Sequence, residues 1–161
     1  MGVFDLGNFE LLKEEIEIRL QFLEIQYFFY RPARSTDVNK VLIRNDPSDN
    51  GCWSYVGNQQ KGTQIIEISE WGFNNRTVPH ELLHGMGIYH EQSRPDRDNY
   101  VEIHDKCIQS GRENNLDKQT TSKTYGIEYN PKSIMHYSSE AFSKHSGCKT
   151  ITSKENLVLI L

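Results

Sequence analysis

The chain has 161 residues, 36% of them hydrophobic, which is the size and composition of a single soluble globular domain. A membrane-spanning protein is excluded, because no uninterrupted apolar run approaches the ~20 residues that a span requires. The chain has 18 basic and 22 acidic side chains and a net charge of -4. Its basic residues form no cluster suited to phosphate backbones or anionic lipid. We therefore expect neither nucleic acid nor a membrane as a partner.

The first half of the chain carries the patterns of regular secondary structure. Apolar side chains recur every three or four residues from Phe9 to Tyr27, which predicts a long amphipathic helix. Short strands are predicted at residues 41–43, 53–56 and 63–69. The last of these alternates like an exposed strand, so residues 64–69 are interpreted either as the edge that pairs with an extended substrate or as a plain sheet edge.

A second helix is predicted from about Thr77, a residue suited to the N-cap, with Pro79 tolerated in its first turn. It should end between Gly85 and Gly87. Beyond this point the sequence is polar and rich in turn residues, so the second half is expected to be loop-rich. This order of elements predicts an α+β fold made of two halves that meet around Gly87.

The three cysteines, Cys52, Cys107 and Cys148, lie far apart and form no Cys-x-x-Cys pair of the kind found in structural zinc sites. Their odd number leaves at least one thiol unpaired. Residues 1–7 lack the basic start and apolar stretch of a secretory signal. The tripeptide Asn75-Arg76-Thr77 matches the N-glycosylation sequon, which is either a used site in a secreted chain or a chance match.

The densest chemical signal is a group of histidines on and after the second helix. His80 and His84 are four residues apart, so both rings project from one helical face at a separation that one metal ion can bridge. Glu81 projects beside them. Gly87 accepts the positive φ that ends a helix and lets the chain reverse, which brings His90 back to the same ion. The spacing thus predicts three nitrogen ligands.

Three protein ligands plus a water are typical of a catalytic zinc, whereas structural sites close the fourth position. Zinc lowers the pKa of its water, and a neighbouring carboxylate, here Glu81, can take the proton and later deliver it to a departing amine. A structural zinc module is disfavoured because no fourth thiolate or imidazole stands at a fixed spacing. The other histidines are expected to face solvent: His104, His136 and His145.

The run HELLHGMGIYHEQSRPDRDNYVEI, residues 80–103, resembles the zinc signature of the astacin family of metzincin endopeptidases. Other metzincins share the three histidines and the glycine, but Glu91 followed by QSRPDRD is similar to astacins only. An independent segment, SIMHY at residues 133–137, resembles the Met-turn of the family. The chain is therefore identified as similar to an astacin over roughly residues 41–151.

The resemblance implies roles for residues outside the histidine group. Met135 would lie beneath the zinc as a hydrophobic floor, and Tyr137 would be an additional phenolic ligand that swings off the ion to hydrogen-bond the tetrahedral oxyanion. Glu91 contacts the new amino terminus of mature family members, so a structural role is expected for it, as for Gly87. The charged residues that follow should hold their loop by ion pairs: Arg94, Asp96, Arg97 and Asp98.

The chain also departs from the family pattern. The family's two disulfides would pair Cys52 with a cysteine shortly before the zinc helix, and an early cysteine with the last one; neither partner is present. Gly72 and Phe73 occupy the region before the helix. Cys107 and Cys148 fall where the family pattern has no cysteine. The C-terminal part of the family's domain is expected to be missing.

The sequence thus predicts one α+β, zincin-like peptidase domain over residues 1–161, with an upper subdomain of about 9–87 and a lower one of about 88–161 flanking a zinc cleft. The predicted function is a secreted zinc endopeptidase for extracellular proteins or peptides, with Glu81 and Tyr137 catalytic. One Zn²⁺ per chain would be held by His80, His84, His90 and Tyr137. The alternative is a weak or inactive astacin-like remnant that acts as a zinc-binding or protein-binding module.

Overall fold

The structure, a computed structural model, describes residues 3–5 and 33–154. These belong to two compact units, one ending at Ile88 and the other beginning at Tyr89. The helix predicted at residues 9–27 and the apolar end of the chain lie outside the described residues. Within the described part, no helix is long and apolar enough to cross a membrane.

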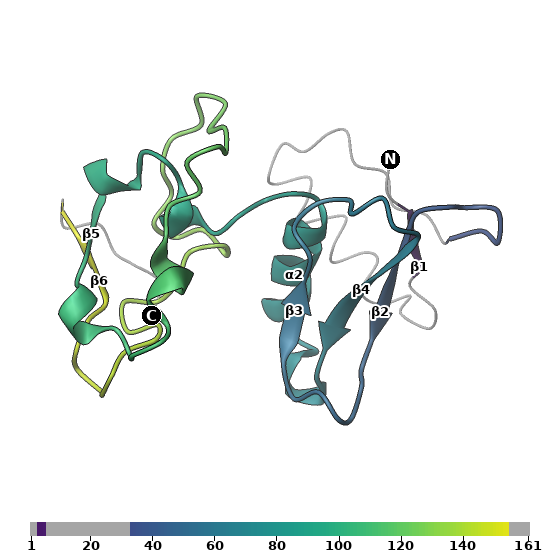
Figure 1. Ribbon diagram of the computed structural model, residues 1–161, viewed down its shortest axis with the longest axis horizontal. Helices are drawn as coiled ribbons and strands as arrows, with labels where there is room; N and C mark the ends of the chain where they lie inside the picture. Colours follow the sequence, from purple (N-terminus) through teal and green to yellow (C-terminus); the bar gives the residue numbers. More distant parts are fainter. Residues whose placement is uncertain (1–2, 6–32, 155–161) are drawn as a thin grey trace. The chain divides into compact units, whose positions relative to one another are not determined.

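The first unit contains a four-stranded sheet in the order β1-β2-β4-β3 (Figure 1). The strands β1, β2 and β4 run parallel, and β3 pairs antiparallel to β4. The bounds of the strands are β1 (Val3–Asp5), β2 (Lys40–Arg44), β3 (Cys52–Ser54) and β4 (Thr63–Ile68). The three predicted strands are confirmed as β2, β3 and β4, although β3 and β4 end earlier than expected, and β1 was not predicted.

The interpretation of residues 64–69 as a sheet edge is wrong, because β4 lies inside the sheet between β2 and β3. Its alternation arises from a buried polar residue, Glu67, which is fully inaccessible to solvent. The Glu67 carboxylate accepts hydrogen bonds from Arg44 Nε and from the Asp46 N–H, both at 2.6 Å. These partners make burial of the charge possible. Among the described strands, the antiparallel edge is β3.

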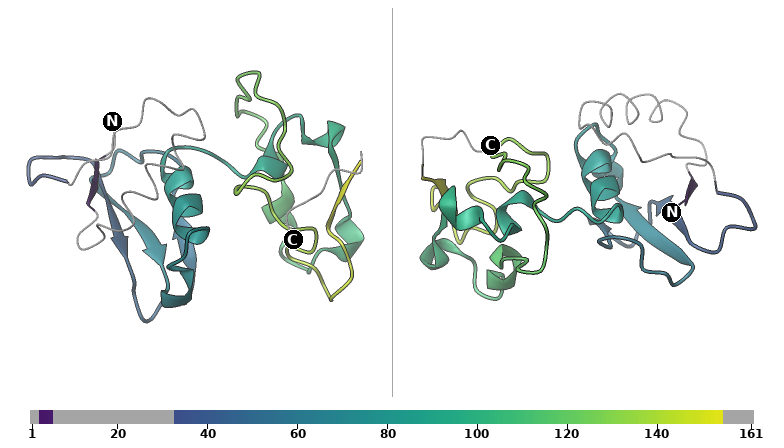
Figure 2. Two further views of the ribbon diagram at one scale, coloured as in Figure 1. Left: turned by 180° about the vertical axis from the view of Figure 1, so that it is seen from behind. Right: turned by 90° about the horizontal axis from the view of Figure 1, so that it is seen from above.

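The helix α2 (Thr77–Gly85) packs against β3 and β4, as Figures 1 and 2 show. Its N-terminus differs from the prediction: Thr77 is the first helical residue, and the Asn74 side chain accepts the N–H groups of Arg76 (2.9 Å) and Thr77 (2.8 Å). Arg76 holds the N-cap position without a side-chain capping bond, and the Asn74 side chain instead fixes the turn that leads into the helix. The core between helix and sheet is apolar, with Val41, Ile66, Ile68, Val78 and Leu82 buried.

The end of α2 is confirmed as predicted. Gly87 has φ of +99°, a left-handed conformation that side chains rarely adopt. A Cβ at Gly87 would also lie 3.8 Å from the Cα of Gly57, so the two main chains approach closely here. The His84 carbonyl accepts the N–H groups of both glycines at 2.8 Å. The chain thus leaves the helix through a turn that is tied back to the loop after β3.

The second unit is loop-rich, as predicted, and its only paired strands in the described residues are β5 (Val101–Ile103) and β6 (Ile151–Ser153). Short 3₁₀ helices connect its loops, among them η2 (Glu91–Ser93). A small apolar core holds the loops together, formed by Val101, Ile108, Leu116, Tyr129 and Ile151.

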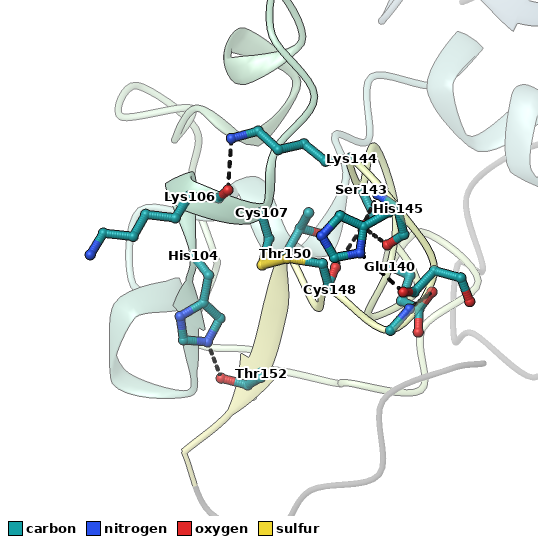
Figure 3. Close-up of a disulfide and its surroundings, with 12 residues drawn as sticks. His104, Lys106, Cys107, Glu140, Ser143, Lys144, His145, Cys148, Thr150 and Thr152 are labelled. Atoms are coloured by element: carbon teal, nitrogen blue, oxygen red, sulfur yellow. Dashed lines mark hydrogen bonds between the residues drawn. A yellow bond between two sulfur atoms is a disulfide. The ribbon is translucent and has the colours of Figure 1, made fainter.

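A disulfide between Cys107 and Cys148 joins two segments of this unit that are 41 residues apart in sequence. Figure 3 shows that the surrounding segments are also hydrogen-bonded: Ser143 Oγ donates to the Cys148 carbonyl (2.6 Å) and Lys144 Nζ donates to the Lys106 carbonyl (2.7 Å). Sequence reasoning left the pairing of these cysteines open. The bridge closes a loop that contains the SIMHY segment.

The remaining cysteine, Cys52 on β3, is a free thiol. A Cβ placed on Gly72 would collide with the Cys52 sulfur. Gly72 therefore occupies the position from which a second cysteine could reach Cys52. This agrees with the expectation, from family resemblance, of a partner cysteine shortly before the zinc helix.

We predict that Gly72→Cys forms a disulfide with Cys52. Because the bridge would close a loop of about 20 residues, it should raise the free energy of unfolding by about 3 kcal/mol relative to the reduced form. Thiol titration should count two free thiols in the reduced variant and none after its oxidation, and denaturant unfolding with and without reductant measures the gain.

The matched control is Gly72→Ala, which adds the same Cβ without a sulfur. It should destabilise the chain by about 1–3 kcal/mol, because the methyl group collides with the Cys52 sulfur. Two reactive thiols in oxidised Gly72→Cys would contradict this account.

Candidate metal centre

Three histidines form a zinc-binding cluster at the end of α2. His80, His84 and His90 each offer one ring nitrogen, and these nitrogens lie within 4.8 Å of one another. Zn–N bonds of about 2.0–2.1 Å place the nitrogens of a tetrahedral site about 3.4 Å apart, so three imidazole nitrogens gathered at this range are a donor set suited to one ion. The residues present therefore fit the metal that their spacing predicts.

The helix sets the first two ligands. The rings of His80 and His84 meet edge to face, with centroids 4.7 Å apart. His84 Nδ1 lies 2.8 Å from the Ile88 carbonyl, which only accepts hydrogen bonds, so Nδ1 carries the proton and Nε2 keeps its lone pair. Burial lowers the pKa of His84 to about 4. The ring is thus neutral at physiological pH, as a metal ligand must be.

The third ligand stands at the start of the second unit. His90 has an extended backbone, and the next residue, Glu91, donates its N–H to the Met135 carbonyl at 2.9 Å. The Tyr137 ring lies 4.3 Å from the His90 ring, centroid to centroid. Met135 itself is buried. The SIMHY segment is therefore held next to the third histidine by a main-chain hydrogen bond and a ring contact.

Glu81 is buried on α2 between the two helical histidines in sequence, and its solvent exposure is only 6%. Burial raises the pKa of its carboxyl group to about 7. A carboxyl with a pKa near the working pH is suited both to accept and to return a proton.

The charged loop after the third histidine is held by ion pairs, as predicted. Arg94 contacts both Glu91 (3.0 Å) and Asp96 (2.8 Å), and Arg97 contacts Asp98 (3.1 Å). The same Glu91 oxygen that meets Arg94 accepts the Asn130 N–H at 2.8 Å. Glu91 thus connects its own loop to the segment that precedes SIMHY.

Sequence reasoning missed two residues around Tyr137. His136 was expected to face solvent, but it is 3% exposed and both of its ring nitrogens have partners within 2.6 Å. Gln92 is fully buried and accepts the Tyr137 N–H at 3.0 Å. The sequence offered only their positions as a signal: His136 stands next to Tyr137 in the SIMHY segment, and Gln92 stands two residues after His90.

The sequence model of the astacin peptidase family matches residues 22–159. Blastula protease 10 of Paracentrotus lividus is 44% identical over 107 residues, which cover 65% of this chain and 18% of that protein. Meprin A subunit beta of Homo sapiens is 45% identical over 104 residues, 63% of this chain and 15% of that protein. The chain thus spans less than a fifth of these relatives' length.

Solved structures agree with this fold. High choriolytic enzyme 1, a hatching enzyme zinc-protease from Oryzias latipes, superposes with a TM-score of 0.80 at 27% identity, covering 99% of this chain and 79% of that one. Myroilysin superposes with a TM-score of 0.55 at 20% identity, covering 93% and 84% of the two chains, and shows the fold alone. The α+β, zincin-like prediction is confirmed.

We predict that the purified chain binds one Zn²⁺, and that His90→Ala loses it because two imidazoles leave a zinc site incomplete. Metal analysis after dialysis against trace zinc measures the ratio of zinc to chain. The matched control is His104→Ala, which should retain zinc. The His104 ring is hydrogen-bonded to the Thr152 hydroxyl and lies outside the histidine cluster. Full zinc retention in His90→Ala would remove this residue from the site.

Proposed function

Since the chain belongs to the astacin family of peptidases, we propose that it is a zinc-dependent endopeptidase that hydrolyses peptide bonds of extracellular proteins. The observation that carries the proposal is the histidine cluster with a buried carboxyl group, Glu81, beside its first member. In this proposal the two compact units are the upper and lower subdomains of one peptidase domain.

The chemistry divides between the metal and the side chains around it. When bound, Zn²⁺ supplies a Lewis acid that makes water acidic enough to lose a proton near neutral pH. Glu81 takes that proton and later returns it to the departing amine. Tyr137 donates a hydrogen bond from its phenol to the oxyanion that forms at the attacked carbonyl. His80, His84 and His90 hold the metal, and Met135 forms the apolar floor.

The edge strand β3 is suited to align an extended substrate. The Ser69 N–H donates to the Gly51 carbonyl at 3.2 Å, which makes these residues a hydrogen-bonded pair of the antiparallel ladder. Because such pairs alternate, the main-chain groups of Cys52 and Ser54 point away from β4. A peptide could add to this edge as a further strand, held by its main chain and therefore tolerant of its sequence.

Two features support an extracellular location. The Cys107–Cys148 disulfide belongs to the class of bonds that form and persist in oxidising compartments. Asn75, the acceptor residue of the sequon, is exposed in the turn before α2, where a glycan can extend into solvent. We therefore propose that the chain is secreted.

We predict that Glu81→Gln binds zinc normally but loses proteolysis by about 10²–10⁴-fold in kcat, because an amide cannot accept the proton of the water. The assay is cleavage of a denatured protein with and without a chelator. Glu102→Gln, the same change at an exposed strand residue, should leave the rate unchanged. Stoichiometric zinc without any cleavage by the parent chain would favour the inactive remnant instead.

We predict that Tyr137→Phe lowers kcat by about 10²–10³-fold, the typical effect of deleting one oxyanion donor. KM should change little, since the phenol acts in the transition state rather than in substrate binding. Tyr125→Phe serves as the control, because Tyr125 is 84% exposed. An unchanged kcat in Tyr137→Phe would remove the phenol from the mechanism.

A further inference from the structure

The main chain of Tyr137 is held by side chains on both of its polar groups. Its N–H donates to Gln92 Oε1 at 3.0 Å, and its carbonyl lies 2.6 Å from His136 Nδ1. Both side chains are buried. A backbone held in this way depends on two particular residues rather than on a sheet or helix ladder.

Gln92 is itself fixed in place. It lies on η2, two residues after His90, and its carbonyl accepts a hydrogen bond from Arg97 Nη1 at 3.1 Å. Its own side-chain Nε2 is the one buried side-chain nitrogen or oxygen in the described residues without a partner. The side-chain oxygen of Gln92 is therefore the atom through which this buried amide bonds to the rest of the chain. The partner of that oxygen is Tyr137.

His136 is fixed in one tautomer. The Tyr137 carbonyl can only accept, so Nδ1 carries the proton and Nε2 accepts from the Tyr129 hydroxyl, which lies 2.6 Å away. Tyr129 is buried, and its ring stacks on Tyr100 with centroids 4.6 Å apart. The His136 ring is therefore fixed by Tyr129 at Nε2 while its Nδ1 donates to the Tyr137 carbonyl.

The ring of Tyr137 has close aromatic neighbours. It contacts His90 at 4.3 Å and Phe142 at 5.4 Å between centroids. Phe142 has φ of +57°, a rare conformation for a bulky residue, and its carbonyl accepts the Gln109 N–H at 2.8 Å. With the main chain held on both sides, the remaining freedom of Tyr137 is rotation of its side chain.

We propose that Gln92 and His136 are positioning residues that clamp the main chain of Tyr137, so that the phenol moves only by side-chain rotation toward the zinc cluster. The inference rests on the proposed function, in which Tyr137 serves the oxyanion. Loosening the clamp should lower kcat through Tyr137 and leave zinc binding intact, because neither clamp residue belongs to the histidine cluster.

The first test compares variants that remove or keep each contact. Gln92→Met keeps the volume and removes the acceptor, and His136→Leu removes the donor; each should lower kcat about 10-fold with KM nearly unchanged. His136→Asn keeps an N–H close to the position of Nδ1 and should recover most of the rate. Equal losses in His136→Asn and His136→Leu would overturn the role of the donor.

The second test asks whether Gln92 acts through Tyr137. In a Tyr137→Phe background, Gln92→Met should cost little or no further activity, because the hydroxyl that it positions is already absent. The same ~10-fold loss in both backgrounds would show that Gln92 acts elsewhere and would overturn the proposal.

A third measurement does not need activity and so separates this proposal from the proposed function. Hydrogen exchange of the Tyr137 amide should become at least ~10-fold faster in Gln92→Met, whereas exchange of the Glu91 amide, bonded to Met135, should not change. Unchanged Tyr137 exchange would overturn the clamp even in an active chain. If the parent chain is inactive but the exchange result holds, the clamp stands and the endopeptidase proposal fails.

Discussion

The metal centre depends on how the main chain turns at His84. The carbonyl of this residue accepts two hydrogen bonds, from Gly57 and Gly87, and its ring donates a third to Ile88. A helix that continued through Gly87 would carry the following residues away from the first two histidines. The left-handed glycine ends the helix within one turn of His84, and the ring-to-carbonyl bond places the proton on Nδ1, so that Nε2 is the nitrogen that His84 offers to a metal. One set of backbone and side-chain bonds thus fixes ligand geometry and tautomer together.

The second unit is loop-rich and has no large apolar core to hold it in one conformation. Its apolar cluster is small, and it is supplemented by the Cys107–Cys148 disulfide, by the ion pairs of Arg94 and Arg97, and by the main-chain hydrogen bond from Glu91 to Met135. The clamp on Tyr137 belongs to the same strategy. Where regular ladders are absent, individual side chains fix the main chain that carries the reactive group.

The features that the sequence predicted well are local ones. The spacing of His80, His84 and His90, the helix that carries the first two and the glycine that ends it all follow from periodicity and backbone preference within about ten residues. The resemblance of residues 80–103 and 133–137 to one family added the fold. The sheet order did not follow from the pattern, since Glu67 looks exposed in sequence and is buried by pairing with Arg44.

The features that sequence reasoning missed are contacts between distant segments. Gln92 and Tyr137 are 45 residues apart, and Cys107 and Cys148 are 41 apart, so no local periodicity links either pair. The burial of His136 is a tertiary effect of the same kind, because its partner Tyr129 belongs to the core of the second unit. The metal-binding residues were therefore easier to predict from the sequence than the long-range contacts that surround them.

The central claim is that three imidazole nitrogens share one zinc ion and leave a position open for water. Zinc-edge X-ray absorption of the zinc-loaded chain measures this directly. The account predicts three imidazole ligands at about 2.0–2.1 Å, the remaining scattering coming from oxygen. Sulfur at about 2.3 Å, or fewer than three imidazoles around the metal, would contradict it.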